Sequence, residues 1–264
     1  MNIVVLIKQV PDTWSERKLS GDDYTLDRDA ADAVLDEINE RAVEAALQLQ
    51  EAESSGSAGT VTAVCMGPDR ATDAIRKALS MGVDKAVHLS DEALHGSDAI
   101  QTARALAKAI GTVGAFDLVI AGDESTDGGM GSVPAMLAEL LDLPQLTYAR
   151  KIETDGSSVT VVRETDEGLT TATAPLPAVV SVSEKINEPR YPSFKGIMAA
   201  KKKPVSKLTM ADIGIDAGEV GLGGAASTVI EAAPRPPRTA GQRVNDEGDG
   251  GNKIAEYLIA QKLI

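Results

Sequence analysis

The sequence predicts an α/β fold: a doubly wound, mostly parallel, Rossmann-like sheet with added antiparallel strands and an extended C-terminal arm. Two observations lead to this prediction. Short apolar runs alternate with helical patterns from the start of the chain to roughly residue 145, which is typical of a doubly wound sheet. Hydrophobic residues make up 43% of the chain but aromatic residues only 3%. Small aliphatic side chains must therefore fill the core, as they do in a helix-covered parallel sheet.

Four apolar runs without alternation predict buried parallel strands, at residues 2–8, 60–66, 85–89 and 118–121. Apolar residues at helical spacing predict helices over 36–52, 69–81, 97–110 and the residues after 134. Ligands of such sheets bind beyond the carboxyl ends of the strands. Lys8, Met66 and Gly122 lie at such ends.

The second half of the chain has a different sequence pattern. Residues 149–153, 158–164 and 169–174 predict antiparallel strands with Asp-Gly and Glu-Gly turns between them, and residues 178–183 predict one more buried strand. Residues 214–250 are dominated by Gly, Ala, Pro and charges, and a short helix is expected over 253–263. This tail is either disordered or an arm wrapped over a partner subunit.

A glycine-rich loop within residues 117–134 follows the fourth strand and precedes an apolar helix. This geometry places free backbone N–H groups and a helix N-terminus beside an anion. The alternative is an ordinary βα connection, but such loops usually take about 2 to 6 residues. The loop has neither a Walker motif nor a clean Gly-x-Gly-x-x-Gly. Asp123, Glu124 and Asp127 would repel a polyphosphate, so we expect a nucleotide or another anion with few charges.

Composition excludes several classes of function. The formal net charge of −14 argues against nucleic acid as a partner. The single Cys65 excludes an internal disulfide, and with only His88 and His95, both in surface-like contexts, we expect no metal site. No apolar run reaches the length of a membrane span and no secretory signal is evident, so we expect no membrane insertion and a cytoplasmic location. No spacing of Ser, Cys, His and Asp indicates a catalytic residue.

A second unusual segment runs from Tyr191 to Met198 and is expected to be a loop. Phe194 is one of only two phenylalanines and precedes a run of three lysines at 201–203. An aromatic side chain displayed on a loop indicates a contact with a partner. The alternative is that Phe194 packs locally and the lysines form a solvated run.

Several stretches in order resemble the β (small) subunit of electron transfer flavoproteins. They are Lys8-Gln-Val-Pro-Asp12, Asn39-Glu40, Cys65-Met-Gly-Pro68, residues 78–84, Ala121-Gly-Asp-Glu-Ser-Thr-Asp-Gly128, Leu176-Pro-Ala-Val-Val180, Asn187-Glu-Pro-Arg-Tyr191, Ile197-Met198, Lys201-Lys-Lys203 and residues 237–241. The resemblance implies an adenine-nucleotide-binding fold in an α/β heterodimer. One FAD per heterodimer is held mainly by the α subunit, and AMP is held by this subunit. In electron-bifurcating members a second FAD takes the place of AMP.

By position, the resemblance assigns the nucleotide site to a set of residues at the carboxyl ends of the strands. These are Leu6, Asp36, Glu37, Ile38, Asn39, Met66, Gly122, Asp123, Glu124, Ser125, Thr126, Asp127, Gly128, Gly129, Met130, Gly131, Ser132 and Val133. Ile38 and the region of Thr13 and Trp14 fall near the flavin. Glu164 falls at a position linked with domain motion of the α subunit.

The resemblance also implies that the unusual segment is a recognition loop that docks on dehydrogenases. It consists of Tyr191, Pro192, Ser193, Phe194, Lys195, Gly196, Ile197 and Met198, with Phe194 as the anchor. We therefore expect a nucleotide-binding α/β domain over residues 1–204 and a C-terminal arm over 205–264 that packs on the α subunit.

The function implied is that of a carrier, not an enzyme. It accepts single electrons from acyl-CoA and other flavin dehydrogenases and passes them to a quinone-reducing oxidoreductase. Two other classes compete with this reading. A standalone adenine-nucleotide-binding regulator would be stable without a partner and could lose the tail. An ATP-dependent ligase would need a lysine or arginine inside the glycine-rich loop, and residues 122–134 contain neither.

Overall fold

The computed structural model describes residues 1–52, 59–237, 241 and 243–264. Residues 238–240 of the tail stretch at 237–241 lie outside the described part. The chain divides into two compact units, Met1–Val229 and Ile230–Ile264. No helix in the described ranges is long and apolar enough to cross a membrane.

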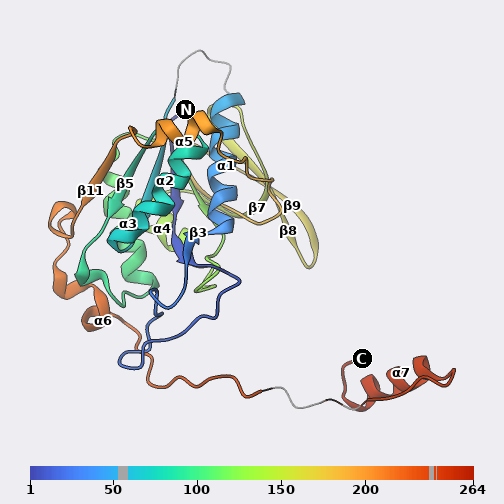
Figure 1. The fold of residues 1–264 in the computed structure, drawn as a ribbon. Helices are drawn as coiled ribbons and strands as arrows, with labels where there is room; N and C mark the ends of the chain where they lie inside the picture. The colour runs from blue at the N-terminus through green and yellow to red at the C-terminus, as the bar shows by residue number, and fades with distance from the viewer. Residues whose placement is uncertain (53–58, 238–240, 242) are drawn as a thin grey trace. The chain divides into compact units, whose positions relative to one another are not determined.

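Within the described residues, one sheet of nine strands forms the centre of the first unit, in the order β11-β5-β4-β1-β6-β10-β7-β8-β9 (Figure 1). Neighbouring strands from β11 to β7 run parallel, and β7, β8 and β9 pair antiparallel. The predicted α/β class, a mostly parallel sheet with added antiparallel strands, is confirmed. The strands are β1 Ile3–Ile7, β4 Val61–Met66, β5 Lys85–Leu89, β6 Leu118–Gly122, β7 Gln145–Thr154, β8 Ser158–Thr165, β9 Gly168–Pro175, β10 Ala178–Val182 and β11 Val205–Leu208.

Helices cover both faces of the sheet, as the unbroken apolar strands require. Helices α1 (Glu37–Ala52) and α2 (Thr72–Met81) share one apolar core with the sheet, and α3 (Ala99–Gly111) and α4 (Val133–Leu141) share the other. Short helical turns connect these elements. They are η1 Asp69–Ala71, η2 Glu92–Leu94, η3 Ala211–Ile213, η4 Ala217–Glu219 and α6 Gly221–Gly224.

The strand order reverses between β1 and β6. From β1 the chain builds β4 and then β5 on one side, and it returns to the other side of β1 to build β6. The helix after β1 covers one face of the sheet and the helix after β6 covers the opposite face. Such a switch point leaves a crevice outside the carboxyl ends of the two strands, where ligands of open α/β sheets bind.

Three elements differ from the sequence prediction. The chain after β1 forms a small hairpin of β2 (Gln9–Pro11) and β3 (Ala33–Leu35) instead of an irregular connection. Residues 194–200, expected in a loop, form the helix α5 (Phe194–Ala200). Residues 205–208, expected in the arm, pair with β5 as β11, so the sheet continues past the boundary expected at residue 204. Short elements of this kind carry too few residues to show a period.

The second unit contains one helix, α7 (Gly250–Ala260), among its described residues. It begins three residues before the expected start at Lys253 because Asp246 holds the preceding turn, where its carboxylate accepts the N–H of Gly248 and Gly250 (both 2.8 Å). Within this unit Ile254, Ile259 and Leu263 are exposed.

His88 is buried, and the expectation of a surface-like context is wrong for it. It lies in β5 with its Nε2 3.1 Å from the carbonyl oxygen of Gly67, and its Nδ1 has no partner among the described residues. Burial lowers the pKa of His88 below its ordinary value of 6.5, and the Gly67 carbonyl offsets this only in part. His95 is exposed and lies 2.8 Å from the carboxylate of Asp23.

We predict that stability falls as the pH drops below about 6.5, because the unfolded chain then binds a proton at His88 that the folded chain does not bind. His88→Gln should remove this part of the pH dependence, whereas His95→Gln should retain it. Urea denaturation between pH 5 and 8 measures both. Equal slopes of unfolding free energy against pH in wild type and His88→Gln would contradict the assignment.

Candidate nucleotide-binding site and docking surface

The glycine-rich loop after β6 lies directly against the start of α1. A Cβ atom on Gly122 would lie 2.7 Å from Nδ2 of Asn39 and 2.9 Å from Cγ2 of Ile38. A side chain at Gly122 would therefore push the loop away from α1. The structure thus brings together residues 36–39 and 122–133, which are far apart in the sequence, at the switch point of the sheet.

Asp36 holds both of these segments with one buried carboxylate. Its Oδ1 accepts the backbone N–H of Ile38 (2.9 Å) and of Asn39 (3.3 Å), which caps the start of α1. Its Oδ2 accepts the backbone N–H and the hydroxyl of Thr126, at 2.7 and 2.9 Å. The position of the loop is therefore fixed relative to the helix by a single side chain that has no exposed surface.

A second carboxylate, Asp127, is held by cations from two other segments. Its side chain is only 2% exposed, and it lies 2.7 Å from Nζ of Lys8 and 3.4 Å from the guanidinium of Arg28. Lys8 also donates to the hydroxyl of Ser125 at 3.1 Å. Burial raises the pKa of Asp127, but the attraction of Lys8 and the hydrogen bonds outweigh burial and lower it. Asp36 and Asp127 are thus internal supports of the loop, whereas the carboxylate of Glu124 stays exposed on it.

The N-terminus of α4 opens at the end of this loop. The hydroxyl of Ser132 donates to the carbonyl of Met130 at 3.2 Å, and no side chain in the described part of the chain caps the helix. Pro134 in this turn has no N–H, and the N–H of Met136 donates to the carbonyl of Ser132 at 3.0 Å. The N–H groups of Val133 and Ala135 are therefore the ones available to an anion, and the helix dipole favours negative charge there.

The remaining predicted residues differ in exposure. Leu6 is buried in the apolar core that α3 and α4 share with the sheet, and Met66 is half-buried against it. Burial raises the pKa of Asp123, which is half-buried at the end of β6. Glu37, Glu124, Gly128, Gly129 and Met130 are exposed. Among the described residues, no group of three or more His, Cys, Asp and Glu side chains could hold a metal ion.

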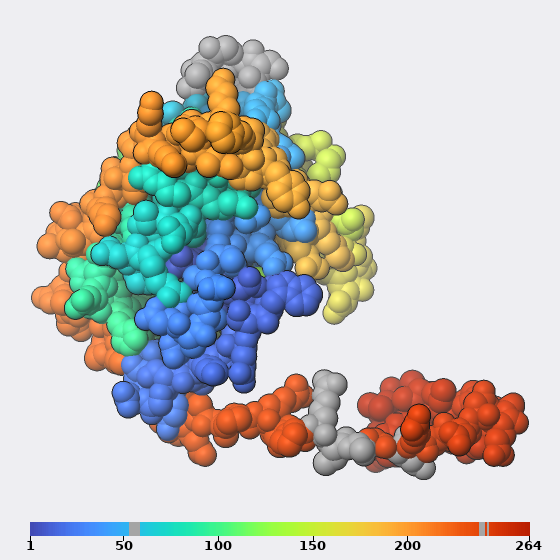
Figure 2. All heavy atoms as spheres, viewed as in Figure 1, coloured from blue at the N-terminus to red at the C-terminus, as the bar shows by residue number. Residues whose placement is uncertain are grey.

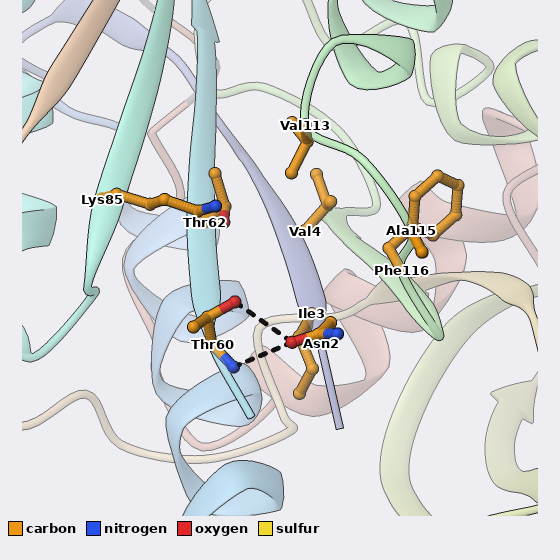
Figure 3. Close-up of a pocket in the computed structure, with 9 residues that line it drawn as sticks. All are labelled: Asn2, Ile3, Val4, Thr60, Thr62, Lys85, Val113, Ala115 and Phe116. Carbon is orange, nitrogen blue, oxygen red and sulfur yellow. Dashed lines mark hydrogen bonds between the residues drawn. The ribbon is translucent and has the colours of Figure 1, made fainter. Parts of the chain in front are cut away.

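A separate hollow lies at the other end of the strands. It is lined by residues around the starts of β1, β4 and β5 with Val113, Ala115 and Phe116, and Asn2 and Thr60 hydrogen-bond at its rim (Figure 3). Ligands of this fold bind at the carboxyl ends, and the loop with the open helix end is there. This hollow is therefore not the predicted nucleotide site.

The segment expected to be a recognition loop is a short helix with a coil before it. Ser193 caps α5, where its hydroxyl accepts the N–H of Gly196 at 3.0 Å. The side chains of Tyr191 and Phe194 are 94% and 81% exposed, and Ile197 and Met198 are also exposed. The alternative that Phe194 packs locally is therefore wrong, and the segment presents an apolar surface on a helical element.

Helix α5 is fixed to α2 by close backbone contact. A Cβ on Gly196 would collide with the carbonyl oxygen of Ser80, so only glycine allows the two helices to approach this closely. The guanidinium of Arg76 donates to the carbonyls of Ala200 (2.6 Å) and Lys203 (3.1 Å). In Figure 2 the orange surface of this segment lies over the cyan surface of α2.

Lys203 caps the C-terminal end of α2, because its Nζ donates hydrogen bonds to three carbonyl oxygens there. They belong to Leu79, Gly82 and Val83, at 3.0, 3.0 and 2.6 Å. Only Lys201 and Lys202 of the lysine run are exposed, so the interpretation as a solvated run holds for two of its three members.

The coil before α5 is clamped to α1 by Arg190. This guanidinium bonds the buried carboxylate of Glu44 (2.7 and 3.1 Å) and that of Glu51 (2.6 and 3.0 Å). Asn187 and Arg41 also exchange hydrogen bonds through their side chains and backbone carbonyls. The exposed aromatic residues therefore project from a rigid base.

Glu164, near the end of β8, lies on the surface between two cations. Its carboxylate is 3.0 Å from Arg150 and 3.0 Å from Lys185, and the hydrogen bond from Lys185 lowers its pKa. Trp14 is exposed, and its backbone N–H donates to the carboxylate of Asp12. Both side chains are accessible to a partner.

Sequence reasoning missed Arg28 as a support of the loop and Arg190 as the clamp of the docking segment. Arg28 lies in the connection between β2 and β3, which has no periodicity. Nothing in the local sequence therefore predicts that Arg28 pairs with Asp127. Arg190 lies in the stretch Asn187–Tyr191, but its partner Glu44 is on α1, 146 residues away. No signal in the sequence marks this pair, because the burial of Glu44 is seen only in the structure.

We predict that Asp36→Ala lowers the free energy of unfolding by about 2–4 kcal/mol, because it removes a helix cap and the bonds to Thr126 together. Asp36→Asn keeps one acceptor and should lose less. Glu37→Ala, at the neighbouring exposed position, should stay within about 0.5 kcal/mol of wild type. Urea denaturation measures all three, and equal effects of Asp36→Ala and Glu37→Ala would refute the assigned role.

Comparison with known proteins identifies the family. The profile of the electron transfer flavoprotein domain matches residues 23–213. The chain is 66% identical over 264 residues to the electron transfer flavoprotein subunit beta of Mycobacterium tuberculosis (strain ATCC 25618 / H37Rv), covering 100% of this chain and 99% of the relative. It is 36% identical over 274 residues to the subunit beta of Megasphaera elsdenii, covering 100% of both chains. The caffeyl-CoA reductase-Etf complex subunit CarD of Acetobacterium woodii is 32% identical over 261 residues, covering 99% and 97%. The chain therefore belongs to the electron transfer flavoprotein family and is one of its β subunits.

Proposed function

We propose that this chain pairs with an α subunit to carry single electrons from flavin dehydrogenases, such as acyl-CoA dehydrogenases, to a quinone-reducing oxidoreductase. The observation that carries the proposal is the anchored segment formed by helix α5, which exposes Phe194, and by the coil before it, which exposes Tyr191. A large exposed aromatic pair on a fixed base is typical of an interface anchor. The chain is a carrier and not an enzyme in this proposal.

The docking surface, formed by the exposed side chains of Tyr191, Phe194, Ile197 and Met198, has a composition that suits a contact that must release quickly. Its anchor is a small apolar set on α5, and Lys195, Lys201 and Lys202 are exposed around it in a chain of net charge −14. Small interfaces with a few anchors give weak complexes, and local opposite charge raises the rate of encounter. Because Arg190, Gly196 and Lys203 fix the base, little ordering would be needed on docking.

AMP is the proposed ligand of the glycine-rich loop. The first turn of α4 would receive its phosphate, since this is the uncapped helix end at the switch point. Asp36 and Lys8 would keep the loop in the receptive conformation. Bound AMP would stabilise the fold by mass action without taking part in electron transfer.

The FAD is proposed to be held mainly by the α subunit, and this chain would complete its surroundings near Trp14 and Ile38. The flavin supplies the one-electron chemistry when bound. The exposed apolar side chains of α7 support the proposal that the C-terminal arm packs on the α subunit. The exposed Glu164 carboxylate would contact that subunit's mobile domain.

A second FAD, as in electron-bifurcating members, is the alternative occupant of the loop. We propose AMP because Asp123 and Glu124 of the loop would repel a ligand with many charges, and a nucleoside monophosphate carries few. A standalone regulator is disfavoured because it would need neither the docking helix nor the arm.

We predict that Phe194→Ala lowers the rate of electron transfer from an acyl-CoA dehydrogenase by about tenfold or more, since loss of one interface anchor costs about 1–2 kcal/mol or more. Flavin content should not change. The matched control is Leu169→Ala, which removes a side chain that is 65% exposed on β9, away from α5, and should leave the rate unchanged. An unaltered rate in Phe194→Ala, measured by stopped-flow flavin reduction, would show that docking occurs elsewhere.

A further inference from the structure

Tyr148 has an unusual backbone for an aromatic residue inside a strand. Its φ is +60°, in the left-handed region that bulky side chains rarely adopt. The cause is a bulge in β7. Val180 and Val182 of β10 are two residues apart, but their partners Leu146 and Ala149 are three apart. One residue of β7 is therefore extra at this point.

The bulge turns Tyr148 out of the regular alternation. Leu146 and Ala149 both pack in the core on the α1 and α2 face, whereas the side chain of Tyr148 reaches Gly131, in the loop that leads into α4. The backbone N–H of Tyr148 donates to the hydroxyl of Ser181 at 3.0 Å, and Ser181 is buried. An interior hydroxyl thus holds the strained residue in place.

The redirected side chain reaches the glycine-rich loop. The phenol of Tyr148 donates to the carbonyl of Gly131 at 3.4 Å. Gly131 itself has a φ of +65°, and a Cβ there would lie 3.0 Å from the phenol oxygen. The tyrosine therefore lies against the end of the loop that leads through Ser132 into α4.

Packing does not explain why this conformation is kept. The side chain of Tyr148 is 46% exposed, so burial of its ring cannot be the reason for the bulge. Strained residues and bulges that redirect a side chain are concentrated at binding sites. Among the described residues, the phenol reaches the end of the loop at the N-terminus of α4, which the proposed function uses.

We propose that Tyr148 is a positioning residue of the nucleotide site. It fixes the Gly131 end of the loop so that the N–H groups of Val133 and Ala135 at the start of α4 face the ligand's phosphate. The inference rests on the proposed AMP site and adds to it a determinant of selectivity: Tyr148 favours a nucleoside monophosphate over the nucleoside. Binding of the base and the ribose does not depend on Tyr148.

The test is calorimetric titration of the heterodimer from which bound AMP has been removed. It is titrated with AMP and, separately, with adenosine. Tyr148→Ala removes the phenol, and Tyr148→Gly removes it while accepting the left-handed backbone without strain. Both variants should bind AMP about tenfold more weakly, because the N–H groups that meet the phosphate are no longer held in place. Their affinity for adenosine should stay within about twofold of wild type. Tyr148→Phe, which keeps the ring, should lie between wild type and Tyr148→Ala.

Unchanged AMP affinity in both Tyr148→Ala and Tyr148→Gly would overturn the inference, and so would equal losses for AMP and adenosine. Because Tyr148→Gly relieves the strained backbone, a change of melting temperature that leaves the AMP to adenosine ratio constant would show a structural role only. A wild-type heterodimer that bound no AMP would overturn the proposed nucleotide site together with this inference. Normal wild-type binding with unaffected variants would overturn the inference alone.

Discussion

The buried carboxylates of Asp36 and Asp127 are the constraint on which the site depends. A buried charge is tolerated only when it is fully paired, so each carboxylate dictates where its partners must be. Asp36 requires the start of α1 and Thr126 to lie together, and Asp127 requires Lys8 and Arg28 to converge on the loop. Four segments distant in sequence are thereby assembled at the switch point of the sheet, with the end of α4 left open.

The segment that carries Tyr191 and Phe194 is also held by polar side chains beneath it, among them another buried carboxylate, Glu44. Lys203 and Arg76 satisfy backbone carbonyls between α2 and α5, and Arg190 satisfies the buried Glu44. In both places exposed groups are held by hydrogen bonds and ion pairs from partly or fully buried side chains beneath them. This separation suits a carrier, since the contact groups stay free to bind and release while their supports remain paired.

The sequence predicted the parallel strands, the helices and the glycine-rich loop because each has a local signature: an unbroken apolar run, a helical period or clustered glycines. It could not predict the conformation of residues 194–200 or the sheet membership of residues 205–208, because these short segments are determined by contacts with α2 and β5. His88 was misjudged since a strand end can be buried or exposed. Arg28, Arg190 and Tyr148 were missed because their partners are distant in sequence and because a bulge leaves no pattern in a single sequence.

The most direct test of the account is to identify the nucleotides released when the purified heterodimer of this chain and its α subunit is denatured. The central claim is that the loop held by Asp36 and Asp127 binds AMP in an electron carrier. Chromatography of the released material should show one FAD and one AMP per heterodimer. Two FAD without AMP would contradict the assignment of the loop, and the absence of flavin or of a stable complex would contradict the carrier itself.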